Sequence, residues 1–165
     1  MGSAEKYYRA LLVVQNFTEG QLRQKWKDEY CSQVIHTHDG IRVHFYESNF
    51  DHAFFESSER RHGSRTPKSK DVFSPRRAAR MMWIKDVLAD PEAEMYVGYD
   101  SKSKNYTGSK RVSVVKGDYV VVIQIYAERE ANFITAYVAD DSIDKIKSGP
   151  KWETNEDAEN KKDAD

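Results

Sequence analysis

The feature that most limits the fold of this chain is a series of four β-type segments joined by short connections. They span residues 95–100, 106–115, 119–126 and 132–138. The segment 119–126 is the most apolar, so we expect it at the centre of a sheet. The connections 116–118 and 127–131 are too short for the crossover that parallel strands require. The series therefore predicts an antiparallel meander.

Helices are expected before this meander. Ser74 suits an N-cap and Pro75 the first helical position, and apolar residues then recur at helical spacing as far as Asp90. Residues 5–36 also read as two helices, the second capped by Thr18, and residues 41–46 alternate as a strand. The pattern predicts an α+β fold, with N-terminal helices and one core helix packed on a four- to five-stranded antiparallel sheet.

Three regions follow from this pattern. We expect an N-terminal helical segment at residues 1–40, an α+β domain at 41–148, and a disordered acidic tail at 149–165, because the tail is nearly all polar. A length of 165 residues suits one domain with a core.

Composition favours a cytoplasmic protein. Cys31 is the only cysteine and cannot form an internal disulfide, so a reducing compartment is expected. No secretion signal and no apolar run of membrane-spanning length is present, so no membrane contact is expected. No phosphate-binding glycine loop, cysteine pair or carboxylate cluster suggests a cofactor or metal, and we interpret His36-Thr37-His38 as a solvated turn.

Positive charge is concentrated in residues 60–80. Eight basic side chains stand there against Asp71 alone, a net charge of +7 in a chain whose total is −1. Arg76 and Arg80 lie four residues apart and should share a helix face. The run is either a solvated, disordered loop or an anion-binding surface.

The closing segment 132–138 carries the most suggestive side chains. Alternation in a strand would place Phe133, Thr135 and Tyr137 on one face, and Ile134, Ala136 and Val138 on an apolar face suited to helix packing. A hydroxyl beside an aromatic ring can hold a phosphate and stack a base. The alternative is a strand whose polar face is simply solvated.

One histidine stands out upstream, His52, within an aromatic stretch. Histidine is the side chain whose unperturbed pKa suits proton transfer near neutral pH. A histidine among aromatic residues is also commonly a core or edge residue without catalytic duty.

Three motifs together resemble the barnase–EndoU–colicin D–RelE superfamily of metal-independent ribonucleases, most closely its phage-associated branch. They are Phe50-Asp51-His52-Ala53-Phe54, the run 77–84 (RAARMMWI), and Phe133-Ile134-Thr135-Ala136-Tyr137. The resemblance covers about residues 41–140. It implies an endoribonuclease that attacks through the RNA 2′-hydroxyl and leaves a 2′,3′-cyclic phosphate, in a toxin or phage setting, on a target that could be tRNA.

The resemblance also implies that Thr135 and Tyr137 lie in the active site and that His52 transfers protons. From the chemistry of RNA cleavage we expect Arg80, with Lys110 or Arg111, to neutralise the phosphate, Thr135 to hydrogen-bond a phosphate oxygen, and Tyr137 to stack or orient the substrate. Arg76 and Arg77 are further candidates for substrate binding, and an immunity protein or antitoxin is implied as partner. The alternative is a non-catalytic module that binds RNA or protein through the basic segment 60–80.

Overall fold

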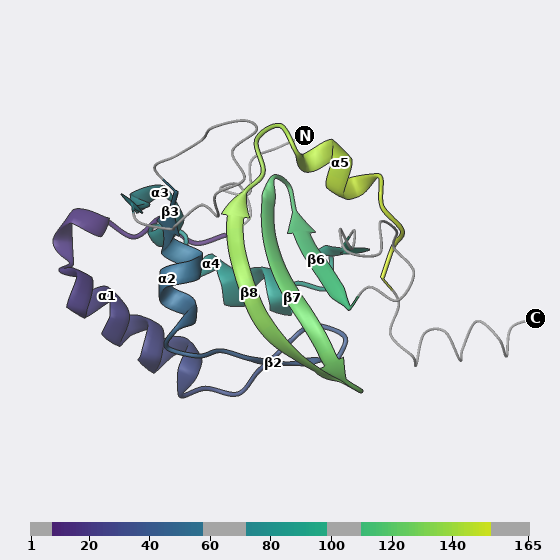
Figure 1. Ribbon diagram of the computed structural model, residues 1–165, viewed down its shortest axis with the longest axis horizontal. Helices are drawn as coiled ribbons and strands as arrows, with labels where there is room; N and C mark the ends of the chain where they lie inside the picture. Colours follow the sequence, from purple (N-terminus) through teal and green to yellow (C-terminus); the bar gives the residue numbers. More distant parts are fainter. Residues whose placement is uncertain (1–7, 58–71, 99–109, 153–165) are drawn as a thin grey trace, which may run out of the picture.

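The computed structural model describes residues 8–57, 72–98 and 110–152, and its central element is a mixed sheet of six strands (Figure 1). The strand order is β1-β2-β8-β7-β6-β5, and β3 and β4 form a separate pair. The strands are β1 (Ile35–His36), β2 (Arg42–His44), β3 (Phe55–Glu56), β4 (Val72–Phe73), β5 (Glu94–Val97), β6 (Arg111–Lys116), β7 (Tyr119–Ala127) and β8 (Glu130–Val138).

The predicted meander is present, but the sheet is larger than predicted and not wholly antiparallel. Strands β5 to β8 pair antiparallel in sequence order, and β7 lies inside the sheet. The prediction was wrong for β2, which pairs with β8 in parallel, with Val43 opposite Ala131. Parallel pairing is possible because the long chain between β2 and β8 supplies the crossover that a short turn cannot.

The helices lie in short pieces. They are α1 (Glu19–Trp26), the π-helix η3 (Lys27–Cys31), α2 (Asn49–Phe54), α3 (Pro75–Ala78), α4 (Trp83–Ala89) and α5 (Ile143–Lys147), with a 3-10 turn η2 (Val14–Asn16) before them. Thr18 caps α1 as predicted, because its hydroxyl accepts from the Gln21 N–H while the Gln21 side chain accepts from the Thr18 N–H.

The first predicted helix is wrong where it can be seen. Residues 8–13 are not helical, and the Leu12 N–H instead donates to the carbonyl of Ala79 (2.9 Å). Tyr8 and Leu12 pack against the core from this irregular segment. The apolar spacing that predicted a helix therefore arises because these side chains are buried beside α3 and α4, although residues 8–13 themselves are not helical. Residues 5–7 lie outside the described part.

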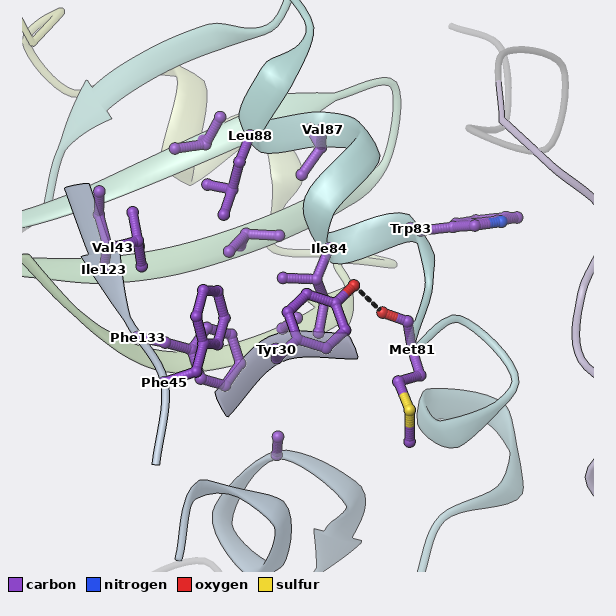
Figure 2. Close-up of a cluster of buried hydrophobic side chains, with 14 of the residues drawn as sticks. Tyr30, Val43, Phe45, Met81, Trp83, Ile84, Val87, Leu88, Ile123 and Phe133 are labelled. Atoms are coloured by element: carbon purple, nitrogen blue, oxygen red, sulfur yellow. Dashed lines mark hydrogen bonds between the residues drawn. The ribbon is translucent and has the colours of Figure 1, made fainter. Parts of the chain in front are cut away.

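The predicted core helix is divided into α3 and α4 by a turn at residues 79–82. Ser74 does cap α3, accepting from the Arg77 N–H, and Pro75 occupies its first position. The division is stabilised by two buried tyrosines: Tyr119 donates to the carbonyl of Arg80, and Tyr30 donates to that of Met81 (Figure 2). These carbonyls therefore have partners without a continuous helix.

One face of the sheet carries the core. The helices α1, α2 and α4 supply apolar side chains to it, and Figure 1 shows α4 behind the strands and α2 beside β8. Trp26 lies at the aromatic centre, with its ring 5.6 Å from Phe45, 5.3 Å from Phe54 and 5.4 Å from Phe133. Another part of the core is formed by Ile84, Val87 and Leu88 of α4, which face the sheet near Ile123 of β7 (Figure 2).

The opposite face is covered over only part of its length. At one end, Ile143 of α5 is buried with Tyr96, Val115, Val120 and Ala139 in a second, smaller cluster. The folded part also extends past residue 148, since Val97 and Trp152 pair with Pro150 and Met95 through backbone hydrogen bonds. The rest of the predicted tail, 153–165, lies outside the described residues. Within the residues described, no helix has the length and apolar character to cross a bilayer.

Candidate functional site

The candidate site lies on the sheet face opposite the core, and a β-bulge determines which side chains reach it. The pairing of β8 with β7 passes from Phe133 to Thr135 and skips Ile134. Phe133 and Ala136 both face the core, whereas Tyr137 packs in the cluster on the other face. The prediction that Phe133 shares a face with Thr135 and Tyr137 is therefore wrong, because the extra residue reverses the alternation between them. Thr135 and Tyr137 do share a face.

Three polar atoms on this face are shielded from solvent and have no hydrogen-bond partner among the described residues. They are Nε2 of His44, Oδ1 of Asn132 and Oγ1 of Thr135. His44 on β2 lies directly opposite Asn132 on β8. Thr135 follows Asn132 by about two strand steps, roughly 7 Å. Buried polar groups are nearly always hydrogen-bonded, so these three atoms mark the candidate site.

A row of polar side chains crosses the sheet through this point. Strand register places Arg111 opposite Gln124, Gln124 opposite Asn132, and Asn132 opposite His44. Alternation along each strand puts all four on the face away from the core. The predicted binding residue Arg111 thus shares a sheet face with Thr135, at the far end of the row from His44.

Tyr137 lies at the other end of the site, beside Arg77. The guanidinium of Arg77 is 5.7 Å from the centre of the Tyr137 ring, and its Nε lies 3.2 Å from Oε1 of Glu56. Burial raises the pKa of Tyr137, and the charge of Arg77 opposes that rise only in part. The phenol is consequently a protonated hydrogen-bond donor at neutral pH.

The predicted proton-transfer residue, His52, is placed differently. It is exposed on α2, whose buried residues Phe50, Ala53 and Phe54 occupy the other side of the helix. Those residues belong to the main core, which lies against the opposite face of the sheet from Thr135 and Tyr137. Strand register, in contrast, brings His44 next to the Thr135 strand.

The remaining predicted binding residues are dispersed. Arg76 forms a bidentate ion pair with Asp140 at 2.8 and 2.9 Å, and Arg80 stacks over Trp83 at 5.1 Å from the ring centre. Lys110 lines a separate hollow with Ile125 and Trp152. Of the basic segment, residues 60–71 lie outside the described part.

Electrostatics around His44 come from one carboxylate and one arginine. Nε2 of His44 lies 3.5 Å from Oε1 of Glu130, within ion-pair range, but the two do not form a hydrogen bond. Arg42 shares the face with His44, two residues earlier on β2. Within residues 8–57, 72–98 and 110–152, no cluster of three His, Cys, Asp or Glu is arranged to hold a metal.

Sequence reasoning missed His44 and Asn132, although the signal for His44 was present. The alternation of residues 41–46 already puts Arg42, His44 and Tyr46 on one polar face. What could not be read is that this face adjoins Thr135, because the parallel pairing of β2 with β8 joins residues about 90 positions apart in the chain.

Comparison with family models, with curated proteins and with solved structures gave no match to this chain.

Proposed function

We propose that this protein is a metal-independent endoribonuclease whose active site lies on the face of β2 and β8 that points away from the core. The carrying observation is a group of three atoms, on His44, Asn132 and Thr135, that have no hydrogen-bond partner within residues 8–57, 72–98 and 110–152. Leaving such an atom buried and unpaired costs about 1–3 kcal/mol. RNA offers a partner to each of them: a phosphate oxygen can accept from the hydroxyl of Thr135, the 2′-hydroxyl can donate to Nε2 of His44, and an N–H of a base can donate to Oδ1 of Asn132.

The chemistry needs few groups, because RNA brings its own nucleophile beside the scissile phosphate. His44 takes the proton of the 2′-hydroxyl as that oxygen attacks phosphorus. Thr135 donates a hydrogen bond to a non-bridging phosphate oxygen, which gains charge in the transition state. Tyr137 orients the substrate from two strand steps away. The bond between phosphorus and the 5′-oxygen breaks, the 5′-oxygen takes a proton from solvent and leaves as a 5′-hydroxyl, and a 2′,3′-cyclic phosphate remains.

Cationic side chains frame this site. Arg77 lies over Tyr137 at one end, and Arg111 stands in the polar row at the other. Both were among the substrate-binding residues expected from the sequence. The proposal gives the roles expected for His52 and Arg80 to His44 and Arg77, because His44 lies opposite Asn132 on β8 and Arg77 lies over the ring of Tyr137.

The setting proposed is that of a toxin- or phage-associated enzyme in a reducing cytoplasm, restrained by an immunity protein or antitoxin. It rests on the three-motif resemblance and on the solitary Cys31. The non-catalytic alternative uses the same face to bind RNA without cleaving it.

The decisive experiment is RNA cleavage in EDTA with typing of the fragment ends. His44→Ala should lower the rate about 10²- to 10⁴-fold, the usual contribution of a proton-transfer group. Thr135→Val, which keeps the side-chain shape, should lower it about 10²-fold. His36→Ala, on the neighbouring strand β1, is the matched control and should retain wild-type activity.

His52→Ala separates the two histidines. Full activity in this variant with loss in His44→Ala supports the site described here. Loss in His52→Ala with full activity in His44→Ala would return the proton transfer to α2. Binding without cleavage over a broad RNA panel would favour the non-catalytic alternative.

A further inference from the structure

We infer that the substrate is single-stranded RNA, and that bases next to the reacting phosphate stack on Tyr46 and Tyr126. The inference rests on the proposed function and names its substrate class. Its basis is a coincidence of position: of the aromatic residues that the structure describes, only these two are exposed, each at 52%. Both lie beside His44.

Tyr126 is directed to this place by the sheet itself. The pairing of β7 with β8 passes from Ile125 to Ala127, so Tyr126 is the additional residue of a second irregularity. Its ring centre lies 6.0 Å from that of His44, and its hydroxyl donates to Oε2 of Glu130 at 3.3 Å. Bulges commonly redirect a side chain next to a functional site. Here the result is an exposed ring held by a hydrogen bond.

Tyr46 follows His44 by two residues, just after the end of β2. The buried residues Val43 and Phe45 face the core, so alternation turns His44 and Tyr46 to the same side. These two residues line a hollow of about 320 Å³ at the edge of β2, with Arg42 and Glu47. Cys31, Gln33, Val43 and Phe45 complete its wall. Gln33 and Glu47 supply polar groups for a base edge, and Arg42 supplies charge for a phosphate.

Exposed rings beside a phosphate site favour a particular form of RNA. In a duplex each base is already stacked on its neighbours, so its faces are not free to pack on tyrosine. In a single strand the faces are available, and stacking on an aromatic side chain is tolerant of sequence. The two tyrosines therefore favour unpaired RNA, such as a loop or an end, over a helix.

Binding can be measured apart from cleavage with an eight-nucleotide RNA whose riboses are all 2′-O-methylated, because this oligonucleotide lacks the nucleophile. Fluorescence anisotropy at fixed salt would compare three ligands: the single strand, the same strand paired to its complement, and a strand of equal charge with abasic sites. The single strand should bind at least tenfold more tightly than either of the others.

Substitutions test the two rings individually. Tyr46→Ala and Tyr126→Ala should each weaken single-strand binding by roughly 5- to 100-fold, from the usual free energy of one stacked base. Tyr46→Phe and Tyr126→Phe keep the aromatic face and should bind within about threefold of wild type. Val13→Ala, an exposed apolar residue at 49% on the N-terminal segment, is the control and should bind normally.

The outcomes separate this inference from the proposed function. If wild type cleaves RNA but the alanine variants bind the methylated strand normally, stacking is refuted and the ribonuclease stands. If no RNA is cleaved but binding depends on both rings, the stacking surface stands without the enzyme. Equal affinity for strand, duplex and abasic ligand would refute the inference. So would absence of RNA binding, which would leave the rings as a protein contact.

Discussion

We expect the hydroxyl of Tyr30 to contribute more to the free energy of unfolding than a single hydrogen bond does. Tyr30 is 1% exposed, and its hydroxyl donates to the carbonyl of Met81 while accepting from the N–H of Lys85 at 3.1 Å. Lys85 is the third residue of α4, which lacks a side-chain cap from Met82. The hydroxyl thus both terminates the turn after α3 and caps α4.

Replacing Tyr30 by Phe tests this directly, because the ring and its contact with Trp26 at 4.6 Å remain. The Lys85 N–H would lose its partner, at about 1–3 kcal/mol, and the carbonyl of Met81 would lose one of two donors, at about 1 kcal/mol, because it also accepts from the Ile84 N–H at 3.4 Å. Allowing for relaxation, the free energy of unfolding should fall by about 2–4 kcal/mol, a large part of the usual total. Tyr119→Phe is the matched control, since its hydroxyl serves one carbonyl at 3.3 Å and should contribute about 1 kcal/mol.

Urea unfolding, followed by circular dichroism and tryptophan fluorescence, gives the measurement. The midpoint for Tyr30→Phe should drop by about 1–2 M with an unchanged slope. A loss under 0.5 kcal/mol, or one equal to that of Tyr119→Phe, would refute the idea that Tyr30 stabilises the break between α3 and α4.

Two other predictions concern acid stability and thiol reactivity. Burial alone would raise the pKa of Asp90, but hydrogen bonds from the Glu92 N–H and Tyr8 and the charge of Lys116 lower it overall. The free energy of unfolding of Asp90→Asn should therefore be about 1–3 kcal/mol lower than that of wild type at pH 7. This difference should shrink below about pH 4, because the wild-type carboxylate becomes protonated. A difference that stays constant down to pH 2 in acid unfolding would contradict the prediction. Burial raises the pKa of the Cys31 thiol, so alkylation by iodoacetamide, followed by mass spectrometry, should be slower at pH 8 than for a free thiol. Single-stranded 2′-O-methyl RNA should slow it further, whereas a rate equal to that of free cysteine would count against both the burial and the hollow.

Local chemistry explains what could be predicted from the sequence. The caps at Thr18 and Ser74 act over three residues, and the meander follows from connections too short for any other pairing. Short-range signals of this kind do not depend on the rest of the molecule.

Long-range contacts explain what could not be predicted. The helical spacing of residues 77–88 continues unbroken through 79–82, yet the chain turns there, and Tyr119 and Tyr30 donate to the carbonyls of Arg80 and Met81 in addition to backbone N–H groups. The segment of residues 8–13 is likewise irregular where the Leu12 N–H donates to the carbonyl of Ala79, between α3 and α4. In both cases a distant residue changes what local propensity favours.

The sequence by itself determined an α+β domain with a central apolar strand, and it placed Thr135 and Tyr137 as a pair on one face of β8. Only the tertiary structure decided what faces that pair. A bulge at Ile134 moved Phe133 to the core face, and parallel pairing brought His44 beside Asn132 in place of His52. The physical reason is that register between strands depends on the packing of both faces of the sheet, and one inserted residue reverses every side chain beyond it.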